Sequence, residues 1–480
     1  MSRRRYGTCP PTGGLVQNVY TDTTYTEILY YRGQGDSTMW TSTYGATQAL
    51  RYAVTGEAAA KANTIAVVET LRDHLRVTRT EGYVGRYVGP LDNPIFWLDV
   101  FQLDEFRYGE GIWLGTFYLS NSSSDQYDGF FNNLATIYDL VDDAATRQLI
   151  KSMIKEVIDK LAANRWLILN EEGLPTTAAP QIAGSERISF ALIAAHIIDT
   201  PEYWQLYEDV YEDQIQTLPF SSVAFWNRYT EYFAMNLKHL NYFTIFRLEP
   251  DEERLRELFR IYMQKVRPWV EDGRQVYFDY VYLTGCERLG VCEGSYGIME
   301  RGVNSLHKFR EWPNVQWFVT PPPAEVDPIS QWLVDLQEKL PAFLQDLLGF
   351  ELQAKQGYDL DERCIQDYMW QRSPYKMSCG PFPLDWPEHM LPGADYLMAY
   401  WLGRHTGYLT PHDIDAPPGD DDDDNDDTTD DDAGDDDAGD DDAGDDDAAD
   451  DDTADDDAAD DDNDDAAGSD DESEQGGCGC

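Results

Sequence analysis

The sequence lacks the long apolar runs that cross a membrane. No stretch of about 18 apolar residues occurs in the 480-residue chain, so we expect no transmembrane segment in it. Three arginines follow Ser2, but no apolar segment comes after them, so we expect no signal peptide in this chain. The chain is then either cytosolic, or trimmed at its ends, or read from a mis-called start, and features near residue 480 favour trimming.

Several common catalytic patterns are missing as well. The sequence has no nucleophile elbow with a Ser-His-Asp set, no glycine loop that cradles phosphate and no dinucleotide-binding fingerprint. It also has no alternation of strands and helices, which disfavours a doubly wound sheet. Kinase, NTPase and dehydrogenase functions are therefore poor interpretations.

Cysteine is scarce, with seven in the chain, and none form a Cys-x-x-Cys pair. The seven histidines do not cluster near them, so we expect no structural zinc and assign no metal ligands. Cys286 and Cys292 flank a short glycine-containing loop and suit a local disulfide, and Cys364 and Cys379 suit a second one. The alternative is that all are isolated buried thiols.

Positive charge is in short supply. Of the 90 acidic residues, 34 lie within 420–480, which has no Lys or Arg, so residues 1–419 hold 56 acidic and 36 basic residues. Because phosphate contacts need Lys and Arg, we expect no nucleic-acid partner. An anionic membrane surface is disfavoured for the same reason.

Residues 416–480 form an Asp-rich, low-complexity tail with GDDDA-like repeats every five residues. From residue 420 to the closing cysteines it offers no apolar side chain larger than Ala, so we expect it to be disordered and extended. It is either a passive solubilising spacer or a weak, multisite Ca²⁺ binder. We predict no other cofactor.

Sequence patterns that predict paired helices are abundant in the chain. Residues 36–56 read DSTMWTSTYGATQALRYAVTG, a polar loop and a helix with one apolar face that stops at Gly56, a natural left-handed cap. A second helix follows to about residue 77. Similar pairs are expected at 122–164, 185–218, 221–266 and, less clearly, 276–309, followed by one helix over 329–348 and a last one near 393–403. The glycine-rich stretch up to Gly115 is expected to be a functional loop or a β-insertion.

These pairs resemble the six-hairpin, (α/α)6 toroid glycosidase-like families. The resemblance spans about residues 30–410 and is carried by DSTMWTSTYGATQALRYAVTG, SSDQYDGFFNNLATIYDLV and PGADYLMAYWLGRHTGYL. It implies an all-α toroid over 31–415, between an irregular segment at 1–30 and the disordered tail at 416–480. It also implies a site at one mouth of the ring, on loops preceding the inner helices.

Cleavage of a glycosidic bond needs a proton donor and a second carboxylate. Asp36 with Asp125 or Asp128 is the best set, because different helix starts bring such residues across one cleft. The alternative is that these carboxylates cap their helices. His239 is a candidate general base, although a lone histidine on a helix is more often structural.

Aromatic residues make up 13% of the chain and suit either a large core or a groove for sugar rings. Arginine among aromatics suits a clamp for a substrate carboxylate, or a buried ion pair. The candidate substrate-binding residues are Trp40, Arg86, Trp113, Tyr127, Trp370 and Arg372.

The end of the chain, GGCGC, resembles the start of C-terminal sorting signals of myxobacteria and relatives. This resemblance implies a secreted or cell-surface protein anchored through its C-terminal end, a setting that suits disulfides. We therefore expect an exported carbohydrate-active enzyme of the glycoside hydrolase or polysaccharide lyase type. The alternative is a non-catalytic surface toroid that binds glycan or protein.

Overall fold

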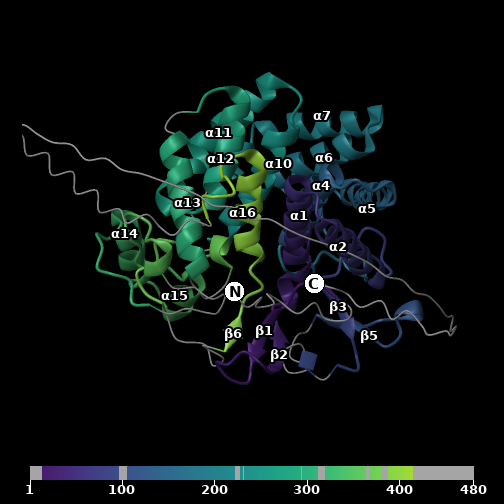
Figure 1. The fold of residues 1–480 in the computed structure, drawn as a ribbon, viewed down its shortest axis with the longest axis horizontal. Coiled ribbons are helices and arrows are strands. Elements are labelled where there is room, and N and C mark those ends of the chain that lie inside the picture. Colours follow the sequence, from purple (N-terminus) through teal and green to yellow (C-terminus); the bar gives the residue numbers. More distant parts are fainter. Residues whose placement is uncertain are drawn as a thin grey trace, which may run out of the picture. The chain divides into compact units, whose positions relative to one another are not determined.

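Helices dominate the structure, as the sequence predicts (Figure 1). The computed structural model describes residues 13–93, 95–96, 105–221, 228–230, 232–292, 295–311, 319–363, 368–379 and 388–414. All of these belong to one compact unit, and the expected tail at 416–480 lies outside the described residues.

Six largely buried helices form the centre of this unit. They are α1 (Ser37–Thr55), α4 (Ser124–Leu140), α6 (Ser185–Ile198), α10 (Phe233–Leu248), α12 (Val276–Leu289) and α16 (Ala394–Thr406). A helix buried on several sides belongs to the interior of a large domain. In α6, for example, every residue from Ile188 to Ala195 is buried.

Five of the six are followed by an amphipathic helix that packs back on them, so the expected hairpins are confirmed. In α2, buried residues such as Ala60, Thr64 and Leu71 recur at helical spacing and leave the other face exposed. The outer helices are α2 (Ala58–Val77), α5 (Ala144–Ala163), α7 (Pro201–Ile215), α11 (Glu252–Lys265) and α13 (Ser295–Glu311).

The central helices contact one another in a cyclic order. Along the chain, each of α1, α4, α6, α10, α12 and α16 packs against the next, and α16 packs against α1, beside which it stands in Figure 1. In addition, α4 contacts α10 directly. The approach of α4 to α1 is close, because a Cβ at Gly129 would lie 2.6 Å from the Cα of Met39.

Two small antiparallel sheets complete the unit. β1 (Gln17–Tyr20) lies between β2 (Ile28–Arg32) and β6 (His389–Met390), with Val19 opposite Tyr30 on one side and His389 on the other. This sheet ties the beginning of the described chain to the segment before α16. The second sheet has the order β3 (Tyr87–Pro90), β5 (Thr116–Leu119), β4 (Phe106–Tyr108), so the expected β-insertion is confirmed.

The helix expected over 329–348 is two helices. α14 (Pro328–Gln337) begins at a cap in which Asp327 accepts the amides of Ile329 and Ser330. α15 (Ala342–Leu348) begins after Pro341, whose ring cannot continue a helix from the residues before it. The shorter elements are α8 (Leu218–Ser221), η1 (Gln34–Asp36), η2 (Gly111–Trp113), η3 (Arg267–Trp269), η4 (Glu271–Gly273), η5 (Leu360–Glu362) and η6 (Met369–Gln371).

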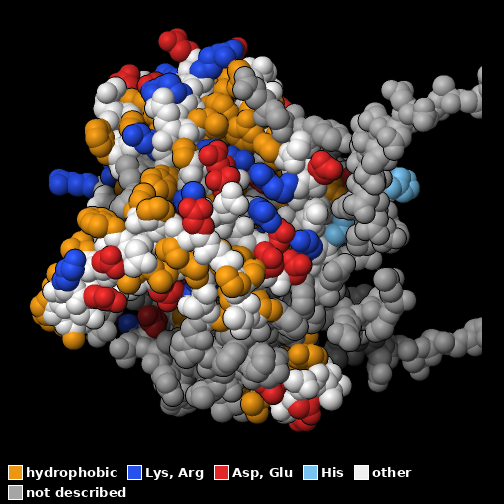
Figure 2. Space-filling view, turned by 90° about the vertical axis from the view of Figure 1, so that its left-hand side faces the viewer, with side chains coloured by type: hydrophobic (Ala, Val, Ile, Leu, Met, Phe, Trp, Pro, Cys, Tyr) orange, Lys and Arg blue, Asp and Glu red, His pale blue; other side chains and the backbone are white. Residues whose placement is uncertain are grey.

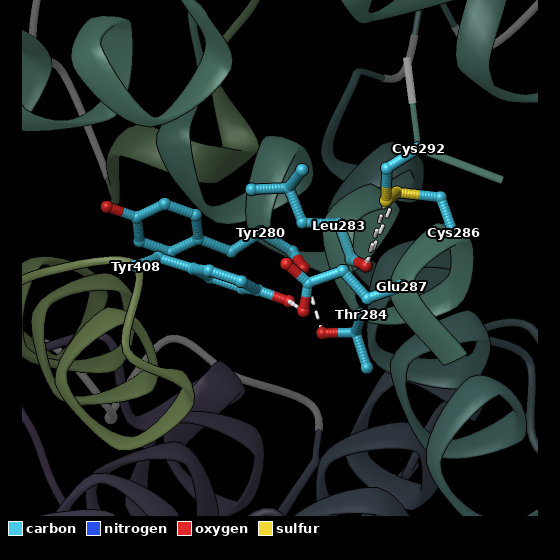
Figure 3. The surroundings of a disulfide bond; sticks show 7 residues. All are labelled: Tyr280, Leu283, Thr284, Cys286, Glu287, Cys292 and Tyr408. Atoms are coloured by element: carbon cyan, nitrogen blue, oxygen red, sulfur yellow. Dashed lines mark hydrogen bonds between the residues drawn. A yellow bond between two sulfur atoms is a disulfide. The ribbon is translucent and has the colours of Figure 1, made fainter. Parts of the chain in front are cut away.

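The predicted local disulfide joins Cys286 at the end of α12 to Cys292 (Figure 3). The next residue, Glu287, accepts a hydrogen bond of 2.8 Å from the Tyr408 hydroxyl, which connects α12 to the segment after α16. Cys364 lies outside the described residues, so the second predicted pair stays a prediction.

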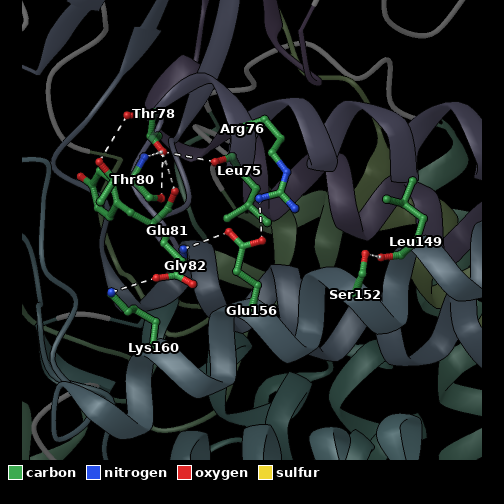
Figure 4. Close-up of polar contacts among 11 residues, drawn as sticks. Leu75, Arg76, Thr78, Thr80, Glu81, Gly82, Leu149, Ser152, Glu156 and Lys160 are labelled. Carbon is green, nitrogen blue, oxygen red and sulfur yellow. Dashed lines mark hydrogen bonds and ion pairs between the residues drawn. The ribbon is translucent and has the colours of Figure 1, made fainter.

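Polar side chains join the outer helices α2 and α5 near the surface (Figure 4). Arg76 lies 2.5 Å from Glu156, which also accepts the amide of Gly82 at 3.2 Å, and Lys160 lies 3.2 Å from Glu81. Exposed pairs of this kind contribute less than about 1 kcal/mol each. Figure 2 shows a face on which basic, acidic and apolar side chains are similarly interspersed. Within the described part of the chain, no helix has both the length and the apolar composition needed to cross a bilayer.

A buried ion-pair network connects α11, α12 and α13. Asp279 on α12 lies 2.7 Å from Arg267, which follows α11, and 2.8 Å from Arg301 on α13. The side chains of Asp279 and Arg267 are only 2% and 5% exposed, so water cannot replace either partner.

We therefore expect Asp279→Asn to lower the free energy of unfolding by about 3–5 kcal/mol, because it leaves the Arg267 charge buried without a counter-charge. Urea denaturation monitored by circular dichroism measures this change. Glu252→Gln, which breaks the exposed pair with Arg256, is the matched control and should cost less than about 1 kcal/mol. Equal losses for the two variants would contradict the structural role of Asp279.

Candidate functional site

Charged side chains collect where three central helices begin. Asp36 is the N-cap residue of α1, Asp125 lies in the first turn of α4, and Glu186 lies in the first turn of α6. The starts of α1 and α4 are joined directly, because the Met39 amide donates to Oε1 of Gln126 at 3.2 Å. Residues at the start of a helix also face its positive end, which favours carboxylates there.

Arg86, on the segment leading into β3, holds the loops before α1 and α4 together. Its guanidinium donates to the carbonyl of Gly35 at 2.7 Å, the carbonyl of Asn121 at 3.0 Å and the hydroxyl of Ser123 at 2.8 Å. Its Nη1 also lies 3.9 Å from Asp36. Ser123 in turn donates to Asp125. The structure therefore brings Asp36, Arg86 and Asp125 together, but the guanidinium is already occupied by the protein.

Asp128 lies one turn further along α4 and is fully buried. Its Oδ1 accepts Nδ2 of Asn241 on α10 at 2.8 Å, and its Oδ2 has no partner among the described residues. Removal from water raises the pKa of Asp128 well above its ordinary value, and the charge of Glu186 raises it further, while the hydrogen bond from Asn241 opposes both. Asp128 is therefore an interior acid that keeps its proton to higher pH than an exposed aspartate.

Glu186 and Lys238 complete this group, and sequence reasoning missed both. Removal from water raises the pKa of Glu186 to about 7, although the Ala183 amide and the charge of Lys238 act in the opposite direction. Burial lowers the pKa of Lys238, which the charges of Glu186 and Asp128 oppose. Both residues are half-buried, so each keeps some accessible surface. We call Asp125, Asp128, Glu186 and Lys238 the acidic cluster.

A hydrogen-bonded network beneath the acidic cluster sets the positions of its helices. Asn132 on α4 accepts the hydroxyl of Ser189 on α6 at 2.7 Å and donates to Asn241 on α10 at 3.2 Å. All three side chains are buried. A satisfied polar network in a dry interior fixes the register of the helices that carry it.

Three of the predicted aromatic residues lie in the core. Trp40 is 1% exposed and stacks on Tyr368 at 3.5 Å, and Trp370, also 1% exposed, donates its indole N–H to the carbonyl of Asp395. The hydroxyl of Tyr127 lies between the backbones of Gly82 and Val84. In these positions the rings have packing roles and are not available to stack on a sugar.

His239 also lies in the core. Its ring stacks on Phe278 at 3.9 Å, its Nδ1 donates to the carbonyl of Met235 at 2.6 Å, and its Nε2 contacts the Tyr262 hydroxyl at 3.2 Å. Burial lowers the pKa of His239 to about 3. A neutral imidazole with both nitrogens occupied is poorly suited to act as a general base.

The remaining predicted residues line surface cavities away from the acidic cluster. Trp113 borders a cavity of about 610 Å³ beside Arg76 and Ile112. Arg372 borders a cavity of about 190 Å³ near the start of α10. The structure therefore does not bring these two side chains to Asp36 and Asp125.

One sequence signal pointed to Glu186. It follows Gly184 and opens a central helix, as Asp36 and Asp125 do after their own polar loops. Lys238 gave no such signal, because it lies inside the apolar helix α10. Among the described residues, no three His, Cys, Asp or Glu side chains are grouped closely enough to hold a metal ion.

No protein-family model matches the sequence, and a search among curated proteins gives no match. A function can therefore be inferred only from the geometry and electrostatics of the site.

The raised pKa of Glu186 has a consequence for stability. In the unfolded chain this carboxyl titrates near its ordinary value of 4.5, and in the folded chain near 7, so between these values the folded protein binds more protons. Stability therefore falls as pH rises through this window, by at most about 1.4 kcal/mol per pH unit for this group.

We expect Glu186→Gln to lose less stability than the wild type between pH 5 and pH 8, because glutamine cannot ionise. Urea denaturation at several pH values measures the slope. Glu212→Gln, on the exposed face of α7, is the control and should keep the wild-type slope. An unchanged slope in Glu186→Gln would show that Glu186 titrates normally.

Proposed function

We propose that the chain is an exported carbohydrate-active enzyme of the glycoside hydrolase type, built as an (α/α)6 toroid. The cyclic contacts of α1, α4, α6, α10, α12 and α16, each of the first five with an outer partner, support the toroid. The disulfide between Cys286 and Cys292 suits an exported protein. The substrate we infer is a carbohydrate chain that reaches the loops before α1, α4 and α6.

The observation that supports hydrolysis most is the pair formed by Glu186 and Asp125. A glycosidase needs one carboxyl group that is protonated near neutral pH and a second that is held as a carboxylate. Glu186, with a pKa of about 7, has the first property. Asp125 accepts hydrogen bonds from Ser123 at one oxygen and from Gln126, at 3.0 Å, at the other, which fixes its position at the start of the adjacent helix.

In the proposed reaction, Glu186 donates its proton to the glycosidic oxygen as the bond from that oxygen to the anomeric carbon breaks. Asp125 stabilises the positive charge that develops on the sugar and accepts a proton from the attacking water, whose hydroxyl adds to the anomeric carbon. Lys238 compensates the charge left on Glu186, and Asp36 lies at the edge of the same region.

A polysaccharide lyase is the second reaction class that the sequence suggested. Such an enzyme must neutralise a uronate carboxylate while a base removes the neighbouring proton. Arg86 is the predicted clamp, but its three nitrogens already donate to Gly35, Asn121 and Ser123. The acidic cluster offers a proton donor and no free cation other than Lys238, so hydrolysis is the better-supported reaction.

A non-catalytic toroid that binds glycan or protein at the cell surface is the alternative function. Binding of sugar without chemistry depends mainly on exposed aromatic platforms. Of the four predicted aromatic residues, three lie in the core and only Trp113 lies at a surface cavity. This distribution favours the enzyme over the binder.

The proposal is tested by reducing-sugar release from a panel of neutral and acidic polysaccharides. We expect Glu186→Gln and Asp125→Asn each to lower kcat/KM by about 10²–10⁴, the usual contribution of a positioned acid or base. The wild-type rate should fall above pH 7 as Glu186 loses its proton.

Glu212→Gln is the control and should keep full activity. Turnover that survives in both Glu186→Gln and Asp125→Asn would refute these roles. Binding of a glycan without any turnover by the wild type would instead support the alternative function.

A further inference from the structure

A cavity of about 190 Å³ lies near the start of α10, apart from the acidic cluster. It is bounded by residues before α10, by the turn after η6 and by the segment after α15. Among the described residues that line it, four are basic and one is acidic, Glu351, which is paired with Lys376 at 2.9 Å. In a chain with 90 acidic and 36 basic residues, such a local excess of positive charge needs an explanation. The four are Arg228, Arg363, Arg372 and Lys376.

Arg363 is the most unusual of them. The residue is only 2% exposed, and neither Nη1 nor Nη2 has a hydrogen-bond partner among the described residues. Its Nε donates weakly to the carbonyl of Asp359 at 3.4 Å. The Asp359 carboxylate is taken by Arg274 and Lys308, at 2.5 and 2.9 Å, so it does not pair with Arg363. A buried guanidinium without a counter-charge is strongly destabilising.

Two other donors at this cavity are also buried and unpaired in the described structure, namely Nε of Arg228 and the hydroxyl of Tyr232. Arg228 is held by the ring of Tyr375, whose centroid lies 3.9 Å from its guanidinium carbon. Burial lowers the pKa of Arg363 to about 10, so the guanidinium stays charged at neutral pH. Three residues therefore offer unused donors at one cavity, and two of them are cations.

We propose that this cavity is a binding site for an oxyanion group, a carboxylate or a sulfate, which Arg363 holds with its two terminal nitrogens. Guanidinium binds such groups through two parallel hydrogen bonds, and burial strengthens the interaction. The buried Oε1 of Gln353, also unpaired in the described structure, supplies an acceptor for a hydroxyl group. The ligand class is therefore a small hydroxylated acid, such as a sugar acid, or a free inorganic anion. This proposal does not depend on hydrolysis by the acidic cluster.

The test uses the full chain and measures binding of sodium sulfate, sodium glucuronate and glucose by calorimetry and by thermal unfolding at constant ionic strength. We expect sulfate or glucuronate to bind and to raise Tm, whereas glucose has no effect. Tighter binding of glucuronate than of sulfate would identify the hydroxylated acid, and the reverse would identify the inorganic anion. Absence of binding by both anions would overturn the proposal.

Two variants separate a ligand site from a structural charge. Arg363→Gln should weaken anion binding at least about tenfold, and without anion its Tm should equal or exceed that of the wild type, because an unpaired buried charge is removed. A lower Tm with unchanged binding would overturn the proposal. If Arg363→Gln does not fold, anion binding is measured with Lys376→Gln, which changes the partly exposed rim of the cavity. Unchanged anion affinity in Lys376→Gln would also overturn the proposal.

Arg256→Gln is the matched control. It removes an arginine from the exposed face of α11 and should leave both anion affinity and Tm near those of the wild type. Because these measurements need no turnover, their failure leaves the proposed roles of Glu186 and Asp125 untouched.

Discussion

The arrangement of the central helices depends on the buried carboxyl of Asp128 and the amides beneath it. Asp128 binds Asn241 of α10, and Asn132 one turn away binds both Asn241 and Ser189 of α6. An apolar interface tolerates sliding, but each of these groups loses a partner if one helix shifts. The network therefore fixes how α4, α6 and α10 meet, and with them the helix starts that carry Asp125 and Glu186.

Burial of the acidic cluster among the central helices lowers the stability of the folded chain. Interior carboxyls such as Asp128 and Glu186 bind protons more tightly in the folded chain than in the unfolded chain. Each therefore lowers the free energy of unfolding when the pH is above the ordinary pKa of its carboxyl group. A core that served stability alone would use apolar side chains of the same size here. Local rules of folding are most often broken at functional sites. This is the physical reason for proposing Glu186 and Asp125 as the reacting groups.

Much of the helical framework could be predicted from the sequence, and the site only in part. Gly56 and Pro201 predict a helix end and a helix start where the structure has them, whereas the single helix expected over 329–348 is interrupted at Pro341. The polar loops before α1 and α4 pointed to Asp36 and Asp125. Whether a side chain such as Trp40 or Glu186 faces the core or water depends on how neighbouring helices turn toward it. That orientation depends on tertiary packing and cannot be predicted from the periodicity of one helix.

The overall charge of the chain affects how an anion reaches the cavity lined by Arg363 and Arg228. With a formal charge of −54, the chain repels anions at distances within the screening length of the solution. Long-range steering therefore works against an acidic ligand, and only close contacts with groups such as Arg363 and Arg228 can overcome it. Added neutral salt screens the repulsion between whole molecules more than it screens a buried contact. Anion affinity at this cavity should therefore fall less steeply with salt than at an exposed basic patch, because its donors lie inside the protein.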